Sequence, residues 1–233
     1  MNQEKNQYDD QTINSPNPLA RLSHRSRVMK GYNIVLPRLS EGRLLDYGCG
    51  TGVLLNKIKL SQNKFGGECY GYEPFLKERC AENLSIFSDY NKIAELAPFA
   101  TITVFEVFEH LQWKDISIAL NRFKNILKED GMIYISVPIE IGPALILKEL
   151  NRKRLVGNFQ YKFFEFIGAA FLGIPGYRED PDFDYMSHKG FDFRHLIRFF
   201  KSRGWKVKVL GYGPLPIQTW YGNSQVFLSL SRS

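Results

Sequence analysis

The chain has 233 residues, of which 44% are hydrophobic and 14% aromatic, and this composition suits one globular domain with a sizeable core. The net charge is +7, and the three cysteines form no C-x-x-C pair, which indicates reduced thiols in a cytoplasmic protein and disfavours a disulfide-built fold. We expect no signal peptide, because residues 1–18 are polar, and no run is apolar enough to span a bilayer.

We expect residues 1–18 to form a disordered tail and residues 19–233 to form one domain. The segment at 139–187 is too long for a simple crossover, so it predicts a helical insertion after the fifth strand. Alternating strands and helices predict an α/β fold with a doubly wound, mostly parallel, seven-stranded Rossmann-like sheet. Strands are expected at 43–47, 68–72, 85–87, 101–106, 132–137, 205–211 and 225–231, a turn at 129–131, and helices at 19–36, 53–59, 76–84, 115–127 and 191–203.

A glycine-rich turn joins the first strand to the next helix. Asp46 is followed by Gly48, Gly50 and Gly52, and glycines permit positive φ and close approach of a ligand. The following helix start offers free N–H groups, and Glu73 ends the second strand, where it can accept hydrogen bonds from a ribose. The pattern predicts a nucleoside site, and its spacing differs from the G-x-G-x-x-G of dinucleotide-binding proteins.

This turn resembles motif I of class I S-adenosylmethionine (AdoMet) dependent methyltransferases. The segment 106–111, Glu-Val-Phe-Glu-His-Leu, resembles the E-x-x-E-H segment of the branch that contains ubiquinone-pathway O-methyltransferases and small-RNA 2′-O-methyltransferases. The likeness covers residues 19–233 apart from the insertion. One departure is Phe99-Ala100, where the family often has Phe-Asp.

The resemblance implies AdoMet as cofactor and methyl transfer as the reaction. The turn would hold the methionine part, Glu73 the ribose and Asp89 the adenine, although Asp89 is equally suited to cap a helix. The residues expected to bind the cofactor are Asp46, Gly48, Cys49, Gly50, Glu73, Pro74, Asp89 and Glu106.

Glu106, Glu109 and His110 follow the fourth strand, at the expected mouth of the cofactor site. His110 is a candidate catalytic base toward a hydroxyl. Alternatively, the resemblance to small-RNA methyltransferases implies that these three residues and His188 bind Mg²⁺ or Mn²⁺. A third reading is that Glu109 and His110 only order a loop beside the cofactor.

The insertion is expected to decide the acceptor. Its apolar run at 161–172 and the basic triplet at 152–154 fit a lid, a peripheral membrane contact or a packed helical hairpin. The leading function is methyl transfer to a small or lipid-linked acceptor at oxygen. Eight basic residues against Asp192 alone in residues 189–233 keep an RNA 2′-O-methyltransferase as the second hypothesis, without an appended RNA-binding module. The third is a non-catalytic AdoMet-binding protein.

Overall fold

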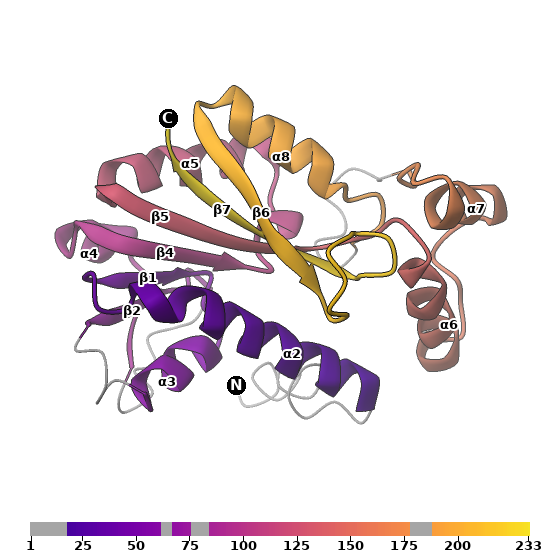
Figure 1. The fold of residues 1–233 in the computed structure, drawn as a ribbon, viewed down its shortest axis with the longest axis horizontal. Helices are drawn as coiled ribbons and strands as arrows, with labels where there is room; N and C mark the ends of the chain where they lie inside the picture. Colours follow the sequence, from indigo (N-terminus) through magenta and orange to yellow (C-terminus); the bar gives the residue numbers. More distant parts are fainter. Residues whose placement is uncertain (1–17, 62–66, 76–83, 178–187) are drawn as a thin grey trace.

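Seven strands form one sheet in the computed structural model, which describes residues 18–61, 67–75, 84–177 and 188–233. The strand order is β3-β2-β1-β4-β5-β7-β6 (Figure 1). The seven-stranded Rossmann-like sheet expected from the sequence is therefore confirmed. In chain order the strands are β1 (Leu44–Tyr47), β2 (Cys69–Tyr72), β3 (Ser85–Phe87), β4 (Phe99–Phe105), β5 (Leu127–Pro138), β6 (Trp205–Gly213) and β7 (Gln225–Arg232).

Strand direction separates the first five strands from the last two. Strands β1 to β5 run parallel to one another, whereas β7 is antiparallel to both β5 and β6. The connection from β6 to β7 contains no helix, and a parallel pairing would need a longer crossover. The sheet is therefore mixed, and the expectation of a mostly parallel sheet describes its first five strands best.

Helices cover both faces of the sheet and enclose two separate apolar cores. Val35, Leu55 and Ile58 belong to the core under α2 and α3, and Phe123 and Leu196 belong to the core under α5 and α8. Figure 1 shows these two helix layers on opposite sides of the strands. The helices of this body are α2 (Pro18–Val35), α3 (Val53–Lys59), α4 (Tyr90–Glu95), α5 (Trp113–Ile126) and α8 (Phe193–Ser202), with short 3₁₀ turns η1 (Leu36–Arg38) and η3 (Phe108–His110).

One expected turn is wrong, and two expected elements lie outside the described residues. The segment 129–131 belongs to β5, because the ladder begins at the pair Phe99–Leu127 and continues at Thr101–Met132. The extra β5 residues between these pairs form a bulge, which a turn-like composition also suits. The expected tail (1–18), apart from Pro18, which begins α2, and the helix expected at 76–84, apart from Leu84, lie outside the described residues.

The insertion contains two helices, α6 (Ala144–Val156) and α7 (Phe163–Phe171), between β5 and α8. Figure 1 shows them beyond the carboxyl ends of β4 and β5, apart from the main body. Their own buried cluster is small, with Leu145, Tyr161 and Ala169 against the partly buried Phe166. The helical insertion is confirmed, and no helix among the described residues is long and apolar enough to cross a membrane.

Candidate active site

The glycine-rich turn leaves β1 in a conformation that favours glycine. Gly48, Gly50 and Gly52 have φ of 74°, 52° and 79°. The amides of Gly48 and Cys49 both donate to the carbonyl oxygen of Tyr72, at 2.8 and 3.2 Å, and thereby tie the turn to the end of β2. A Cβ at Gly48 would lie 2.5 Å from Val107 Cγ2. Backbone hydrogen bonds therefore hold the turn in place, and Val107 leaves no room for a side chain at position 48.

Asp46 lies at the floor of the site and is only 5% exposed. Its carboxylate accepts a 2.7 Å hydrogen bond from the Thr103 hydroxyl on β4. Burial raises the pKa of Asp46 to about 7, against the opposing effect of that hydrogen bond, and repulsion from Glu73 adds to the rise. A buried carboxylate in this condition would gain from a ligand that supplies N–H donors or positive charge.

Glu73 ends β2 and reaches back to the turn. Its Oε2 accepts a hydrogen bond from the Gly50 amide at 3.0 Å, and its Oε1 accepts one from the Phe75 amide at 3.3 Å. The neighbouring Pro74 is exposed. Asp89 is exposed and caps α4, because its Oδ1 accepts a 2.9 Å bond from the Asn91 amide. The cap is therefore observed, while the adenine contact stays a prediction.

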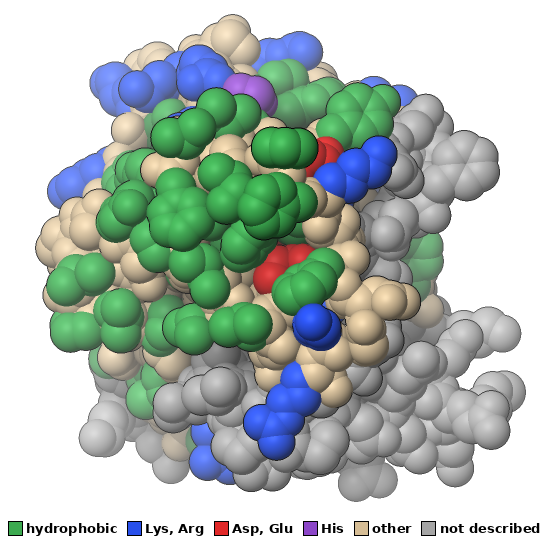
Figure 2. All heavy atoms as spheres, turned by 90° about the vertical axis from the view of Figure 1, so that its right-hand side faces the viewer, with side chains coloured by type: hydrophobic (Ala, Val, Ile, Leu, Met, Phe, Trp, Pro, Cys, Tyr) green, Lys and Arg blue, Asp and Glu red, His purple; other side chains and the backbone are tan. Residues whose placement is uncertain are grey.

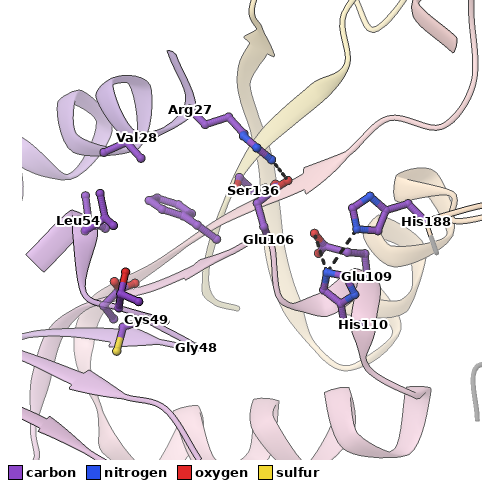
Figure 3. Close-up of a pocket in the computed structure, with 14 residues that line it drawn as sticks. Arg27, Val28, Gly48, Cys49, Leu54, Glu106, Glu109, His110, Ser136 and His188 are labelled. Carbon is purple, nitrogen blue, oxygen red and sulfur yellow. Dashed lines mark hydrogen bonds and ion pairs between the residues drawn. The ribbon is translucent and has the colours of Figure 1, made fainter. Parts of the chain in front are cut away.

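A cavity of about 270 Å³ opens between the glycine-rich turn and the 3₁₀ turn η3 (Figure 3). The structure brings Asp46, Gly48, Cys49 and His110 to its wall, whereas Gly50, Glu73 and Asp89 lie outside its lining. The full lining is Arg27, Val28, Asp46, Gly48, Cys49, Thr51, Val53, Leu54, Phe105, Glu106, Glu109, His110, Ser136 and His188.

Glu106 lies at the centre of a polar network that the sequence did not reveal. Its carboxylate accepts bonds from Arg27 at 2.6 Å, Ser136 at 3.0 Å and Gln225 at 2.7 Å. Burial would raise the pKa of Glu106, but the charge of Arg27 and the bond from Gln225 outweigh it and hold the pKa below its usual range. Glu106 also has φ of 57°, which is uncommon for a side-chain-bearing residue.

No short motif contains Arg27, Thr103, Ser136 or Gln225, so pattern reading could not select them. The sequence predicts only a strand at 132–137 for Ser136 and a helix at 19–36 for Arg27. In the folded chain both side chains reach Glu106 at the end of β4, and this contact cannot be inferred from their sequence positions. Ser136 lies opposite Phe105 in the sheet register, one residue before Glu106.

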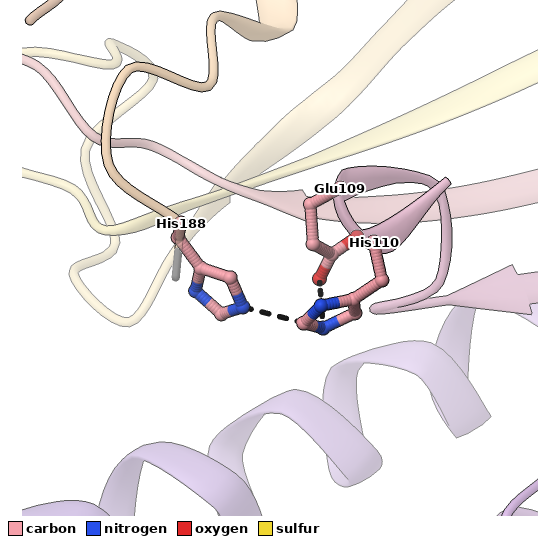
Figure 4. Close-up of side chains that lie close together, drawn as sticks. All are labelled: Glu109, His110 and His188. Carbon is pink, nitrogen blue, oxygen red and sulfur yellow. Dashed lines mark hydrogen bonds and ion pairs between the residues drawn. The ribbon is translucent and has the colours of Figure 1, made fainter. Parts of the chain in front are cut away.

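Glu109, His110 and His188 form a compact cluster at the mouth of the cavity (Figure 4). The two Nε2 atoms of the imidazoles are 3.3 Å apart, and Glu109 Oε1 lies 3.9 Å from His110 Nε2. On the far side of His188, its Nδ1 lies 3.9 Å from the buried carboxylate of Glu140. Burial lowers the pKa of His188 to about 3, so this imidazole is neutral at physiological pH.

The cluster fits a cation by its donor set. Its three ligand atoms lie within 4.8 Å of one another. Two nitrogens about 2.1 Å from one metal ion at a tetrahedral angle are separated by about 3.4 Å, close to the observed imidazole spacing. The fourth predicted ligand, Glu106, lies instead in the network with Arg27.

The chain matches one protein family by sequence, and it resembles solved structures by fold. The sequence model of a methyltransferase domain matches residues 21–172. No curated protein matches the chain by sequence.

Solved structures share the fold at low identity. A methyltransferase from Clostridium acetobutylicum described as S-adenosylmethionine-dependent is 12% identical with a TM-score of 0.57, covering 99% of this chain and 98% of its own. A SAM-dependent methyltransferase from Archaeoglobus fulgidus is 14% identical with a TM-score of 0.54, covering 93% and 100%. A cyclopropane-fatty-acyl-phospholipid synthase-like protein from Lactobacillus casei is 10% identical with a TM-score of 0.55, covering 99% and 100%.

Proposed function

The chain belongs to the methyltransferase-domain family, and on that premise we propose that it transfers a methyl group from AdoMet to a hydroxyl oxygen of a small or lipid-linked acceptor. AdoMet-dependent methyl transfer follows from the family. The oxygen acceptor is our inference from the site. The observation that carries it is the imidazole of His110 at the mouth of the cavity that begins at the glycine-rich turn.

The residues at the glycine-rich turn and at the ends of β2 and β3 would hold the cofactor. Asp46 with the Gly48–Gly50 turn would hold its methionine part, with Cys49 against it. Glu73, beside Pro74, would hold the ribose, and Asp89, two residues after β3, would contact the adenine. The fit is supported by a buried carboxylate with a raised pKa and by a turn in which a Cβ at position 48 has no room. When bound, AdoMet supplies an electrophilic methyl group.

Glu106 would act from the cavity wall. Three donors already hold its carboxylate, and its charge is stabilised by Arg27. It would therefore shape the cofactor site and fix the distance between β4 and α2. Alignment of acceptor, methyl carbon and sulfur can account for roughly 7–11 kcal/mol of barrier reduction. A cavity wall that holds the cofactor in one position would contribute to that alignment.

His110 would remove the acceptor proton. Its side chain is 33% exposed, so an acceptor can reach its Nε2 from the cavity. The positive charge formed on His110 by this proton would be stabilised by the buried carboxylate of Glu109, whose Oε1 lies 3.9 Å from His110 Nε2. His188, whose Nε2 lies 3.3 Å from the same nitrogen, is neutral and therefore does not repel that charge.

A divalent cation is the second candidate role for the same cluster, favoured by the convergence of Glu109, His110 and His188. The mixed nitrogen and oxygen donors suit Mn²⁺ better than Mg²⁺, which prefers oxygen ligands. A cation held there would lower the pKa of an acceptor hydroxyl. It would also occupy the imidazole nitrogens that the base mechanism needs, so the two roles are alternatives.

Methyl transfer from labelled AdoMet to a panel of phenols, sugars, lipid-linked hydroxyl compounds and RNA tests the proposal. We expect transfer to a hydroxyl compound and a loss of at least about 100-fold in His110→Asn. His195→Asn, on the exposed side of α8, is the matched control and should keep full activity. A chelator that abolishes transfer, with recovery on adding Mn²⁺, would favour the cation role.

Other outcomes contradict the proposal. Preferred transfer to RNA would establish the RNA 2′-O-methyltransferase alternative, for which the basic C-terminal part is the only support. AdoMet binding by calorimetry without transfer to any acceptor would indicate a non-catalytic binding protein. Full activity in His110→Asn would show that the imidazole has no part in the reaction.

A further inference from the structure

The helix α7 buries small side chains and exposes large apolar ones, whereas a helix that packs on a protein core does the opposite. Its buried residues are Ala169 and Ala170. Phe163, Phe164 and Phe171 are 71%, 85% and 53% exposed. A large aromatic side chain gains more from burial than alanine does, so this helix is oriented for a surface outside the chain.

Exposed apolar side chains gather on one face around this helix. Figure 2 shows green side chains crowded on the face that lies at the insertion end of the molecule. Of the 19 large apolar side chains that are exposed in the described part of the chain, 13 belong to the insertion or to the loop between β6 and β7. We call these 13 the apolar face: Leu147, Leu150, Phe159, Phe163, Phe164, Ile167, Phe171, Leu172, Ile174, Tyr177, Leu215, Ile217 and Tyr221.

The loop between β6 and β7 packs on the insertion, so the two segments act as one surface. Trp220 is the side chain nearest to a Cβ built at Gly142 and at Gly173, at 3.0 and 3.3 Å. Asn223, fully buried, holds the loop by accepting a bond from the Leu215 amide and donating to the carbonyl oxygen of Thr219. The apolar face is therefore supported from beneath by ordered contacts.

Among the described residues of the insertion, the exposed charges that lack an ion-pair partner are positive. Glu140 pairs with Lys148 at 2.7 Å, and Glu165 pairs with Lys189 at 3.0 Å. Glu149, the remaining carboxylate of the described insertion, pairs with Arg152. Three exposed cations of the insertion have no carboxylate partner within the described residues: Lys153, Arg154 and Lys162.

We propose that the apolar face docks on an anionic lipid bilayer, with the aromatic side chains of α7 in the interface and Lys153, Arg154 and Lys162 at the headgroups. Charge complementarity favours this partner over a second copy of the chain, because a two-fold contact would bring the same cations together. The site lies at the same end of the molecule, since Glu140 belongs to the insertion and His188 follows it directly. Only the purpose of docking, which is access to a lipid-linked acceptor, rests on the proposed function.

Co-sedimentation of the full chain with vesicles tests docking without any acceptor or cofactor. We expect binding to vesicles that contain phosphatidylglycerol, weaker binding as salt is raised, and little binding to phosphatidylcholine alone. Lys153→Gln with Arg154→Gln should weaken binding by about fivefold per charge removed. Phe163→Ser with Phe164→Ser should weaken it by on the order of tenfold per ring.

Leu60→Ser with Ile118→Ser is the matched control, because Leu60, just after α3, is 81% exposed and Ile118, on α5, is 49% exposed. This control should bind vesicles like the wild type, and AdoMet affinity should be unchanged in every variant. Absence of wild-type binding to anionic vesicles, or an equal loss in the control, would overturn the proposal. A wild-type dimer by light scattering that the Phe163 and Phe164 variant dissociates, without vesicle binding, would assign the apolar face to self-association.

If vesicle binding holds but no methyl transfer is found, docking stands and the proposed function fails. If transfer holds and vesicle binding is absent, the reverse applies. The two proposals are therefore tested separately.

Discussion

The insertion and the elements around the glycine-rich turn place their apolar side chains in opposite ways. We call those elements, which are β1, α3 and β2, the cofactor half. In the cofactor half, α3 buries Leu54, Leu55 and Ile58 and exposes Asn56 and Lys59. In the insertion, α7 buries two alanines and exposes phenylalanines. The chain itself covers the apolar side chains of α3, whereas it leaves those of α7 exposed to a partner surface. Substitutions in the cofactor half should therefore alter folding and AdoMet affinity together, whereas substitutions on the apolar face should alter neither.

The largest effect is expected for Asp46→Asn. A pKa raised from 3.8 to about 7 corresponds to about 4 kcal/mol between the two protonation states. Because the pKa is higher in the folded state, the stability given by protonated Asp46 is complete below pH ~4 and is lost as the pH rises through ~7. Asparagine mimics the protonated form, so the ligand-free variant should be more stable at neutral pH, by up to about 4 kcal/mol, and bind AdoMet more weakly.

Chemical denaturation of both proteins between pH 4 and 8, with calorimetry for AdoMet, measures this. The stability difference between variant and wild type should grow as the pH rises. A variant that is less stable at every pH would show that the Asp46 carboxylate stabilises the empty protein, and the comparison would lose its main support.

The next largest effect is expected for Gly48→Ala, because its Cβ would lie 2.5 Å from Val107 in addition to the cost of positive φ. We expect a loss of about 3 kcal/mol in the free energy of unfolding and a large loss of AdoMet affinity. Gly157→Ala is the control, because Gly157 has φ of 85° but no atom within 4 Å of a built Cβ. Equal effects in both would mean that positive φ alone explains the result.

Replacement of Glu73 should act mainly on the cofactor. Glu73→Ala removes the expected ribose acceptor and the partner of the Gly50 amide, and should cost about 1.5–3 kcal/mol of AdoMet affinity. Glu73→Gln can still accept from Gly50 and should lose less. Titration calorimetry compares them, and normal affinity in the alanine variant would remove Glu73 from the cofactor site.

The smallest effect is expected for Arg27→Gln. It takes away the charge that holds the pKa of Glu106 down, and the carboxylate keeps its bonds from Ser136 and Gln225, so the loss in stability should be about 1–2 kcal/mol. Arg38→Gln breaks the more exposed pair with Glu41 and should cost less than about 0.5 kcal/mol. Thermal denaturation at neutral pH is sufficient, and equal losses would contradict a special role for Glu106.

The sequence predicted the glycine-rich turn better than the side-chain contacts of Glu106 and His110, for a physical reason. A turn with three positive φ values restricts the residue type at each position, so Gly48, Gly50 and Gly52 are visible in the letters alone. Glu73 could be found because it ends the strand paired with β1. Both signals are local or one strand away, and five parallel strands follow from the same alternation of elements.

The network around Glu106 and the pair of His110 and His188 depend on side chains that are remote in sequence. The separation is 79 residues for Arg27 and Glu106 and 119 residues for Glu106 and Gln225. His110 and His188 could be grouped only through a family resemblance. The β5 bulge was missed because Glu129 and Asp130 have turn-like composition, while the pairing of Leu127 with Phe99 extends the strand past them.

The bond from Gln225 to Glu106 has a consequence for the order in which this protein matures. Glu106 belongs to the connection after β4, but the donor on β7 reaches it only after α8 and β6 have been laid down beside the sheet. Contacts of such long sequence separation form late in folding, because the intervening loop must be closed first. A chain still emerging from the ribosome would thus carry a glycine-rich turn but an unfinished cavity wall, and competence to hold the cofactor would arrive together with the last strand.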